Sequence, residues 1–355
     1  MKLPLPETLR VDLRYRRDLW RYGYSAEFVD PWAKSLGADS RTGRRWAHAC
    51  MRLENEPHFR PGLFGALWPG LDRDRALAAA ADSCYWGVLA ERAWLGGWGR
   101  SDDDASEALM VRYLNQSLRH AVEFCVGWSE AFLHGTYKGD VMLAGLAEGL
   151  KECPGRVLDL GAGGMPLFPV YRDREWVASD LNLNALRVMK HVLALPSERL
   201  VCHDAQSIPF PSSSFDVVLC RYVIENIRRP LRMLSEVFRI LTPGGTFLLC
   251  VPGSLFVPGG RYYTNREFFP DRPQFEAMLE RTGFRHAYDA PSGVYRLRKE
   301  GRGGGVVTPL FTEPESEGGR TVQPAVRVDG IPVLVPPRFL WPEPGKLPPS
   351  SAFRP

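Results

Sequence analysis

A glycine-rich turn that follows directly on a short apolar run is the feature that most constrains this chain. Residues 157–164 read Val-Leu-Asp-Leu-Gly-Ala-Gly-Gly, so an apolar run containing one acid opens into a turn with three glycines. Glycine adopts positive φ angles at little cost and lets a ligand approach the main chain closely. A buried strand followed by such a turn is typical of a nucleotide-binding site at the edge of a parallel sheet.

Strand-like and helix-like segments alternate around this turn. Short apolar runs typical of buried parallel strands occur at 157–160, 177–179, 200–202, 217–220 and 247–251. Helix-length segments lie at about 183–193, 229–241 and 273–282, and the last leads into two more strand-like runs that are candidates for an antiparallel edge. The alternation predicts an α/β fold with a doubly wound, mostly parallel seven-stranded sheet.

Composition divides the chain into three expected domains. Eight of the ten tryptophans precede residue 130, so residues 1–152 are expected to form a helical, Trp-rich region that caps the site or recognises the substrate. Prolines and glycines before residue 105 favour short helices, whereas apolar residues at three- and four-residue steps predict a long helix over 106–132. Residues 153–300 contain the alternating strands and helices.

The third domain, residues 301–355, is a Pro/Gly-rich tail that holds eleven of the thirty prolines. This composition favours extended or loosely ordered structure, so we expect the tail to be dispensable for folding of the sheet. Within it, Asp329-Gly330 separates two apolar runs between 326 and 335, which predicts a short hairpin. The simpler interpretation is a flexible tail with a local hairpin, and the alternative is a lid or interaction arm.

Acidic residues fall in or just after three successive predicted strands, at Asp159, Asp180 and Asp204. A carboxylate after the second strand can accept both hydroxyl hydrogens of a ribose. One after the third strand can accept from an exocyclic amino group such as that of adenine. Each acid taken alone could equally be a helix N-cap, but the three together favour a nucleotide site.

A nicotinamide dinucleotide is the competing ligand for this geometry. Its fingerprint has Gly or Ala at the sixth position of the glycine motif, where this chain has Pro166. Proline is acceptable in the first turn of a helix, but it offers no N–H to a phosphate. The turn therefore favours a nucleotide without a pyrophosphate.

Five motifs follow one another through the middle of the chain, at 157–163, 179–180, 204–210, 214–218 and 239–245. In this order they resemble the class I S-adenosylmethionine-dependent methyltransferases, particularly the branch with the ubiquinone-biosynthesis and related small-molecule enzymes. The resemblance covers about residues 153–298. It implies a Rossmann-like methyltransferase fold, an enzyme, and S-adenosyl-L-methionine as the methyl donor.

The same resemblance implies a set of cofactor-binding residues. By it, the glycine turn and Asp159 would hold the methionine end, Asp180 the ribose and Asp204 the adenine, with Cys220 and Arg221 beside the sulfonium. The chain departs from the family at Met165, where relatives often have a third glycine. The full set is Asp159, Gly161, Ala162, Gly163, Asp180, Leu181, Asp204, Ala205, Cys220 and Arg221.

Methyl transfer requires a general base only when the acceptor must lose a proton. The sequence singles out no base. Candidates follow the fourth predicted strand, at Arg221, Tyr222 and Glu225, and others are His120, Tyr262 and Tyr263. Each of the first three is as consistent with packing between helix and sheet as with a place in the acceptor site.

The leading hypothesis is transfer to an O, N or C atom of a small metabolite or natural product. A peptide or protein acceptor is the first alternative. A catalytically silent methyltransferase-like subunit that binds a partner is the second.

Composition narrows the partners. The formal charge of +4 is small for 355 residues, which argues against nucleic acid as a partner. No membrane association is expected, because no apolar run reaches the roughly 18 residues that a span requires. Seven scattered cysteines without paired spacing predict reduced thiols and a cytoplasmic protein, and the histidines show no metal-binding spacing. Nothing in the sequence sets an oligomeric state.

Overall fold

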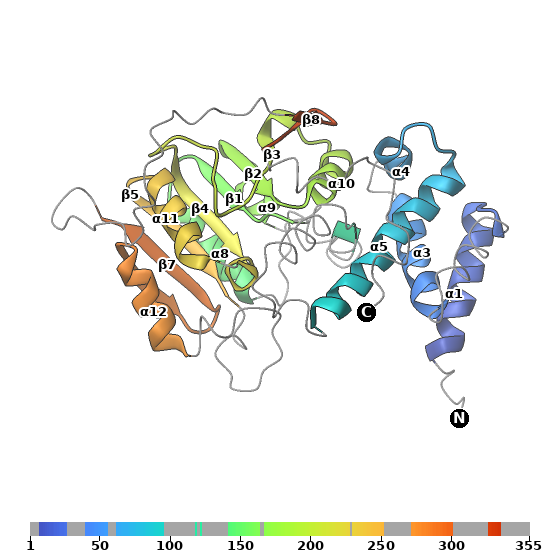
Figure 1. Cartoon of the computed structure of the whole chain (residues 1–355), viewed down its shortest axis with the longest axis horizontal. Coiled ribbons are helices and arrows are strands. Elements are labelled where there is room, and N and C mark those ends of the chain that lie inside the picture. Colours follow the sequence, from blue (N-terminus) through green and yellow to red (C-terminus); the bar gives the residue numbers. More distant parts are fainter. Residues whose placement is uncertain are drawn as a thin grey trace. The chain divides into compact units, whose positions relative to one another are not determined.

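The computed structural model describes residues 7–26, 40–55, 62–95, 118, 121–122, 141–163, 167–227, 229–251, 271–300 and 326–334. The chain divides into two compact units (Figure 1). One contains residues 130–181 and 197–335, and the other contains residues 1–129, 182–196 and 336–355. The predicted helix at 106–132 lies outside the described residues except for Leu118, Ala121 and Val122, which are buried.

The first unit is built on a mixed sheet with the order β6-β7-β5-β4-β1-β2-β3-β9-β8. Its parallel centre consists of β1 (Val157–Leu160), β2 (Trp176–Asp180), β3 (Leu200–Cys202), β4 (Phe215–Arg221) and β5 (Leu241–Cys250). An antiparallel pair, β6 (Phe284–Asp289) and β7 (Val294–Lys299), extends the sheet beyond β5. The doubly wound α/β fold and its antiparallel edge are as the sequence predicts.

The sheet has nine strands in the described residues, so the prediction of seven was wrong in number. The additional strands are β8 (Val326–Val328) and β9 (Ile331–Val333), which form the hairpin predicted in the tail. Positive φ angles at Asp329 and Gly330 make its tight turn. The hairpin adds to β3, because the Leu334 N–H donates to the Cys202 carbonyl at 2.8 Å and Val333 pairs with Cys202. Pairing over this sequence distance leaves no trace in local periodicity.

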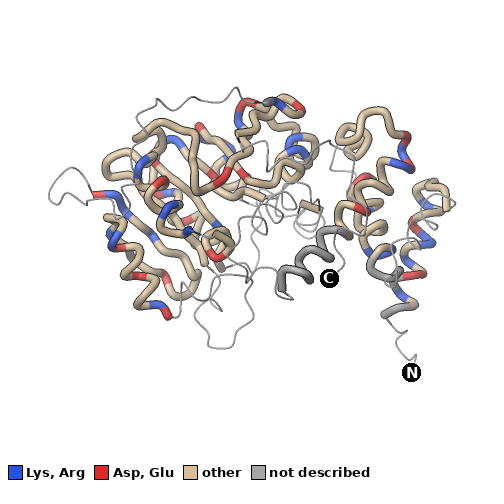
Figure 2. Tube along the Cα trace, in the orientation of Figure 1, with Lys and Arg blue, Asp and Glu red and all other residues tan. Residues whose placement is uncertain are grey.

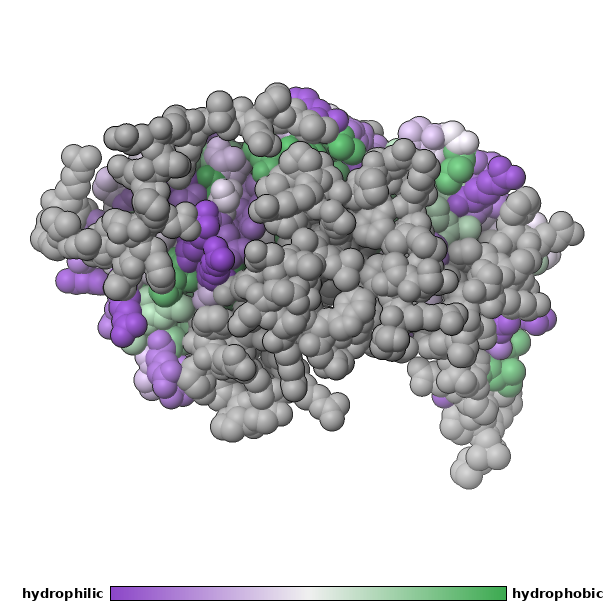
Figure 3. Space-filling view, viewed as in Figure 1, coloured by the Kyte–Doolittle hydropathy of each residue, from purple (hydrophilic) through white to green (hydrophobic). Residues whose placement is uncertain are grey.

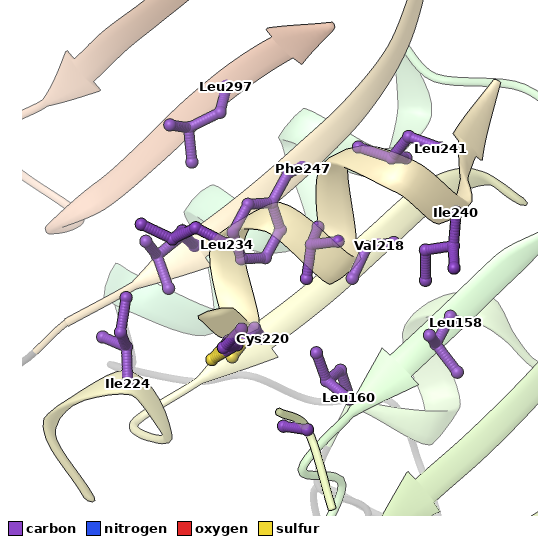
Figure 4. Packing of buried hydrophobic residues seen from close by; sticks show 14 of the residues in the cluster. Leu158, Leu160, Val218, Cys220, Ile224, Leu234, Ile240, Leu241, Phe247 and Leu297 are labelled. Atoms are coloured by element: carbon purple, nitrogen blue, oxygen red, sulfur yellow. The ribbon is translucent and has the colours of Figure 1, made fainter. Parts of the chain in front are cut away.

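The core lies where α11 (Pro230–Ile240) and α12 (Arg272–Arg281) pack on one face of the sheet. Leu158, Val218 and Phe247 are register partners on three neighbouring strands, so they form one buried row across the sheet. Figure 4 shows this row beside Leu234 and Ile240 of α11. The alternation of side chains along a strand therefore turns Asp159 to the opposite face.

Two more α-helices and two 3-10 helices of the described residues belong to the same unit. They are α8 (Val141–Lys151), α9 (Phe168–Tyr171), η2 (Ser197–Arg199) and η3 (Ile224–Asn226). A side chain at Gly149 would lie 3.2 Å from Leu248, which shows how closely α8 approaches β5. Gly164, Met165 and Pro166, which set the path from the glycine turn into α9, lie outside the described residues.

The second unit is helical. It contains α1 (Glu7–Tyr22), α3 (Ser40–Glu54), α4 (Leu63–Leu67), α5 (Arg73–Leu95) and α10 (Leu183–Leu193). The buried Arg187 of α10 donates to the Leu67 carbonyl at 2.8 Å, which ties α10 to α4. The expectation of short helices was wrong for α5, whose 23 residues contain no proline. Pro69 lies between α4 and α5, whereas the prolines at 57 and 61 lie outside the described residues.

Candidate functional site

The glycine turn after β1 is fixed to β2 by its own backbone. The N–H groups of Gly161 and Ala162 both donate to the Ser179 carbonyl at 2.8 Å. Gly161 has a φ of 74°, and a Cβ added there would lie 2.2 Å from Cγ2 of Val223. Both the backbone conformation and the available space therefore require glycine at this position.

Asp180 closes the other side of the turn. Its Oδ2 accepts a hydrogen bond from the Gly163 N–H at 2.7 Å. It is not the cap of the following helix, because the Asn182 Oδ1 accepts from the Ala185 N–H at 2.9 Å at the start of α10. A Cβ added to Gly163 would meet only Asp180 Oδ2, at 3.9 Å. The turn and the acid thus share one site at the carboxyl edge of the sheet.

Asp159 is buried in β1 and accepts a hydrogen bond from α9, the helix after the glycine turn. The Tyr171 hydroxyl donates to Asp159 Oδ2 at 2.7 Å. Burial raises the pKa of Asp159 to about 7, although the Tyr171 hydrogen bond and the positive charge of Arg221 both favour the charged form. This carboxyl group therefore changes its protonation near neutral pH.

Asp204, after β3, is engaged in a local turn. Its Oδ1 accepts from the Gln206 N–H at 2.8 Å, and the Gln206 side-chain amide lies 3.3 Å from each carboxylate oxygen. The ring of His203 contacts the Asp204 carbonyl at 2.9 Å, and burial lowers the pKa of His203. Ala205 is buried beside this turn. The structure thus shows the turn-forming role of Asp204 directly, whereas adenine binding stays a prediction.

The end of β4 holds four more of the predicted residues. Cys220 is buried and pairs in register with Leu160, and burial raises the pKa of its thiol well above the usual range, so it remains protonated. Tyr222 has a φ of 54°, a left-handed conformation that is uncommon for a residue with a side chain. It is held by its N–H bond to the Cys250 carbonyl at 3.1 Å. Backbone strain of this kind is concentrated at functional sites.

Glu225, in η3, is a second buried acid at this end of the sheet. Burial raises its pKa to about 7, against the opposing charge of Arg221. Arg221 therefore acts electrostatically on both Glu225 and Asp159. Of the other base candidates, His120, Tyr262 and Tyr263 lie outside the described residues.

Sequence reasoning missed three residues that hold the site in place: Tyr171, Asn182 and Val223. It placed Ser179 in a motif without giving it a role. Asn182 could have been found, because an Asn just before a helical apolar pattern is an N-cap signal. The contacts of Tyr171 and Val223 carry no sequence signal, since they depend on the packing of the folded chain. In the described part of the chain no cluster of His, Cys, Asp and Glu could hold a metal ion. None of its helices has the length and apolar content to cross a membrane.

Comparison with known proteins places the site inside a recognised domain. Residues 158–249 match the family described as methyltransferase domain. These residues include the glycine turn, all three acids and the end of β4.

Among curated proteins, the chain is 34% identical over 107 residues to the demethylmenaquinone methyltransferase of Renibacterium salmoninarum, covering 29% of this chain and 44% of that protein. It is 28% identical over 190 residues to the ubiquinone/menaquinone biosynthesis C-methyltransferase of Syntrophotalea carbinolica, covering 44% and 80%. It is 30% identical over 159 residues to the malonyl-[acyl-carrier protein] O-methyltransferase of Methylococcus capsulatus, covering 41% and 57%. The chain thus spans less than half the length of the first relative.

Proposed function

We propose that the chain is an enzyme that methylates an oxygen, nitrogen or carbon atom of a small molecule, with S-adenosyl-L-methionine as the methyl donor. The proposal starts from the methyltransferase domain that residues 158–249 match. The hydrogen bond between Gly163 and Asp180 carries this proposal, because it joins the glycine turn to the carboxylate that would accept hydrogen bonds from a ribose. Both lie at the carboxyl edge of the sheet, where doubly wound sheets bind their ligands.

The described residues fit S-adenosyl-L-methionine. A carboxylate accepts about four hydrogen bonds, which suits Asp180 to the two hydroxyls of a ribose. A Cβ at Gly163 would have only Asp180 Oδ2 nearby, at 3.9 Å, so glycine at this position leaves the space beside that carboxylate open. Asp204 and Ala205 would hold the adenine, and Leu181, Cys220 and Arg221 would border the cofactor. When bound, the cofactor supplies a methyl group on a sulfonium.

Transfer of that methyl group is a direct displacement, so the protein contributes orientation and exclusion of water. The elements that orient the site are rigidly joined here. The strands β1 and β4 pair from Val157↔Val217 to Leu160↔Cys220, and the turn is bonded to Ser179. Positioning of this kind contributes roughly 7 to 11 kcal/mol in favourable cases.

We assign proton removal from the acceptor to Glu225. A catalytic base is most effective with a pKa near the working pH, and burial gives Glu225 a pKa of about 7. Arg221 has no acceptor atom, so it cannot take a proton. Tyr222 has an exposed side chain, which makes it a candidate for contact with the acceptor instead.

The acceptor class that these features support is a small molecule with a hydroxyl whose proton must be lost, such as a hydroquinone. Two features support it: the buried Glu225 carboxyl group, whose pKa of about 7 suits a base, and the quinone-related names of two relatives. Recognition of the acceptor is assigned to residues 1–152, because the cofactor motifs name no acceptor residue. The six described cysteines are buried thiols, which supports a cytoplasmic location.

Calorimetry with S-adenosylhomocysteine and with NAD tests the cofactor. We expect binding of the sulfur nucleotide and none of NAD, and the reverse result would overturn the proposal. Transfer of a labelled methyl group to naphthohydroquinone or to a mixed peptide library then tests the acceptor. Label in the peptides alone would assign a peptide acceptor. Tight cofactor binding without transfer to any acceptor offered would favour the silent subunit.

A further inference from the structure

The surface of α1 carries an unusual stripe of exposed apolar side chains. Leu9 is 45% exposed, Leu13 is 51% exposed and Trp20 is 86% exposed. They are half of the six large hydrophobic residues that are exposed in the described part of the chain. Their spacing of four and seven residues places them within about 40° of one another around the helix. We call these three residues the apolar stripe.

The apolar stripe is not the side by which α1 packs into its unit. Tyr15, Asp18 and Leu19 are buried on another side of the helix, where α1 packs against α3. The His48 Nε2 lies 2.8 Å from Asp18 Oδ2, and Arg44 donates to Asp12 Oδ1 at 2.7 Å, so α3 holds α1 in place through both acids. The apolar stripe is therefore presented outward on an anchored helix.

Arginines border the apolar stripe. Arg10, Arg14, Arg17 and Arg21 are exposed and follow each other at steps of four, three and four residues, which makes a second stripe along the helix. Arg16 is exposed on the other side of the apolar stripe. Figure 2 shows Lys and Arg along α1, and Figure 3 shows hydrophobic residues next to hydrophilic ones on the surface over this helix. Among the described side chains of α1, Asp12 pairs with Arg44, and Asp18 pairs with His48 and with Arg17 at 2.8 Å. Arg14, Arg16 and Arg21 therefore carry the exposed positive charge beside the apolar stripe.

This combination suits an anionic lipid surface better than a protein partner. A stable protein interface buries roughly 800 Å² on each partner. One tryptophan buries only about 150–250 Å², and two leucines do not make up the difference. A bilayer interface needs no complementary shape: it accepts Trp and Leu at the level of the headgroups, while Arg side chains reach the phosphates.

We propose that α1 docks this chain on anionic membranes, lying in the plane of the interface with the apolar stripe inserted and the arginines on lipid phosphates. The sequence predicted no membrane association because no apolar run is long enough to span a bilayer, and that test does not detect a helix that lies on the membrane surface. The proposal concerns the surface of the membrane and requires no spanning helix. It goes beyond methyl transfer and does not depend on it.

Sedimentation of the full-length protein with vesicles tests the proposal. We expect binding to vesicles of phosphatidylcholine with phosphatidylglycerol, and little binding to phosphatidylcholine alone. Binding should be lost as salt shortens the Debye length from about 10 Å at 0.1 M to about 3 Å at 1 M. Equal binding to both kinds of vesicle, or to neither, would overturn the proposal.

Matched variants locate the surface. Leu13→Ala/Trp20→Ala should weaken partitioning more than about tenfold, since each buried CH₂ contributes about 0.8 kcal/mol. Arg14→Gln/Arg21→Gln should weaken it by about fivefold per arginine. Leu71→Ala and Arg75→Gln alter exposed side chains outside α1 and should leave partitioning unchanged.

Circular dichroism and the urea midpoint establish that each variant is folded. Full vesicle binding by the folded Leu13→Ala/Trp20→Ala protein would show that α1 is not the membrane-binding surface and would overturn the proposal. Light scattering distinguishes a second copy of the chain as the occupant: a dimer that this double variant dissociates would contradict lipid docking. These readouts need no methyl donor, so they separate failure of this proposal from failure of the proposed function.

Discussion

Tyr171 and Asp159 form a buried hydrogen bond of 2.7 Å that joins the first helix after the glycine turn to the strand before it. Tyr171→Phe removes the donor and leaves the buried carboxyl group without it. We expect the free energy of unfolding to fall by about 1 to 3 kcal/mol, the cost of a buried polar group that loses its partner. Urea unfolding measures this difference. An unchanged midpoint would mean that the bond contributes nothing to the fold.

The raised pKa values of Asp159 and Glu225 predict how stability depends on pH. Both pKa values are about 7 in the folded protein, above the ordinary values of 3.8 and 4.5. Between these limits the folded state binds more protons than the unfolded state, so these groups make stability fall as pH rises from about 4 to about 7. In Asp159→Asn, the change in the free energy of unfolding over this pH range should be smaller by up to about 4 kcal/mol.

A comparison of wild type with Asp159→Asn by urea unfolding at several pH values isolates this effect. The two proteins must be compared, because burial lowers the pKa values of His48 and His203, and these groups make stability rise with pH instead. Parallel curves for the two proteins would contradict the assignment to Asp159.

Asp180 should determine cofactor affinity through its acceptor atoms. Asp180→Ala should weaken S-adenosylhomocysteine binding more than Asp180→Asn, because the amide keeps one acceptor. Losing charge-assisted hydrogen bonds costs about 1.5 to 3 kcal/mol, or roughly 10- to 150-fold in affinity. Asp173→Ala, at an exposed acid of the same domain, is the matched control. Calorimetry decides, and an equal dissociation constant for Asp180→Ala and wild type would exclude a ribose contact.

Gly161 and Val223 should be coupled. Gly161→Ala places a methyl group 2.2 Å from Val223 Cγ2 at a positive φ angle, and we expect a loss of about 1 to 3 kcal/mol in stability. Val223→Ala should recover the steric part of this loss but not the part due to backbone strain. A double-mutant cycle by urea unfolding measures the coupling energy. Strictly additive effects would show that the two side chains do not compete for space.

Glu225 should set the pH profile of methyl transfer. In the wild type we expect kcat/KM to rise with pH through about 7, because only the ionised carboxylate accepts a proton. Glu225→Gln should lower the rate at high pH by about 10²- to 10⁴-fold and remove the rise. Calorimetry with S-adenosylhomocysteine serves as the control for an intact cofactor site. If the Glu225→Gln enzyme keeps the rise of kcat/KM with pH, another group is the general base.

Local pattern predicted the elements well and their partners poorly. The runs at 157–160 and 200–202 coincide with β1 and β3, because an apolar run bounded by polar residues carries the strand signal itself. The pairing of β9 with β3 could not be predicted, since no periodicity records which distant strand covers an edge. Likewise the motif indicated Asp159 as a site residue, but only the folded packing shows that Tyr171 holds it.

The hairpin of β8 and β9 also imposes an order on synthesis. The edge of β3 is made by residue 202, while Val333, which covers it, follows about 130 residues later. At translation rates of about 5–20 residues per second, the nascent sheet waits on the order of 10 s with that edge open. An open edge offers unpaired N–H and C=O groups to other chains. Aggregation of this protein should therefore depend on how long translation pauses before residue 333.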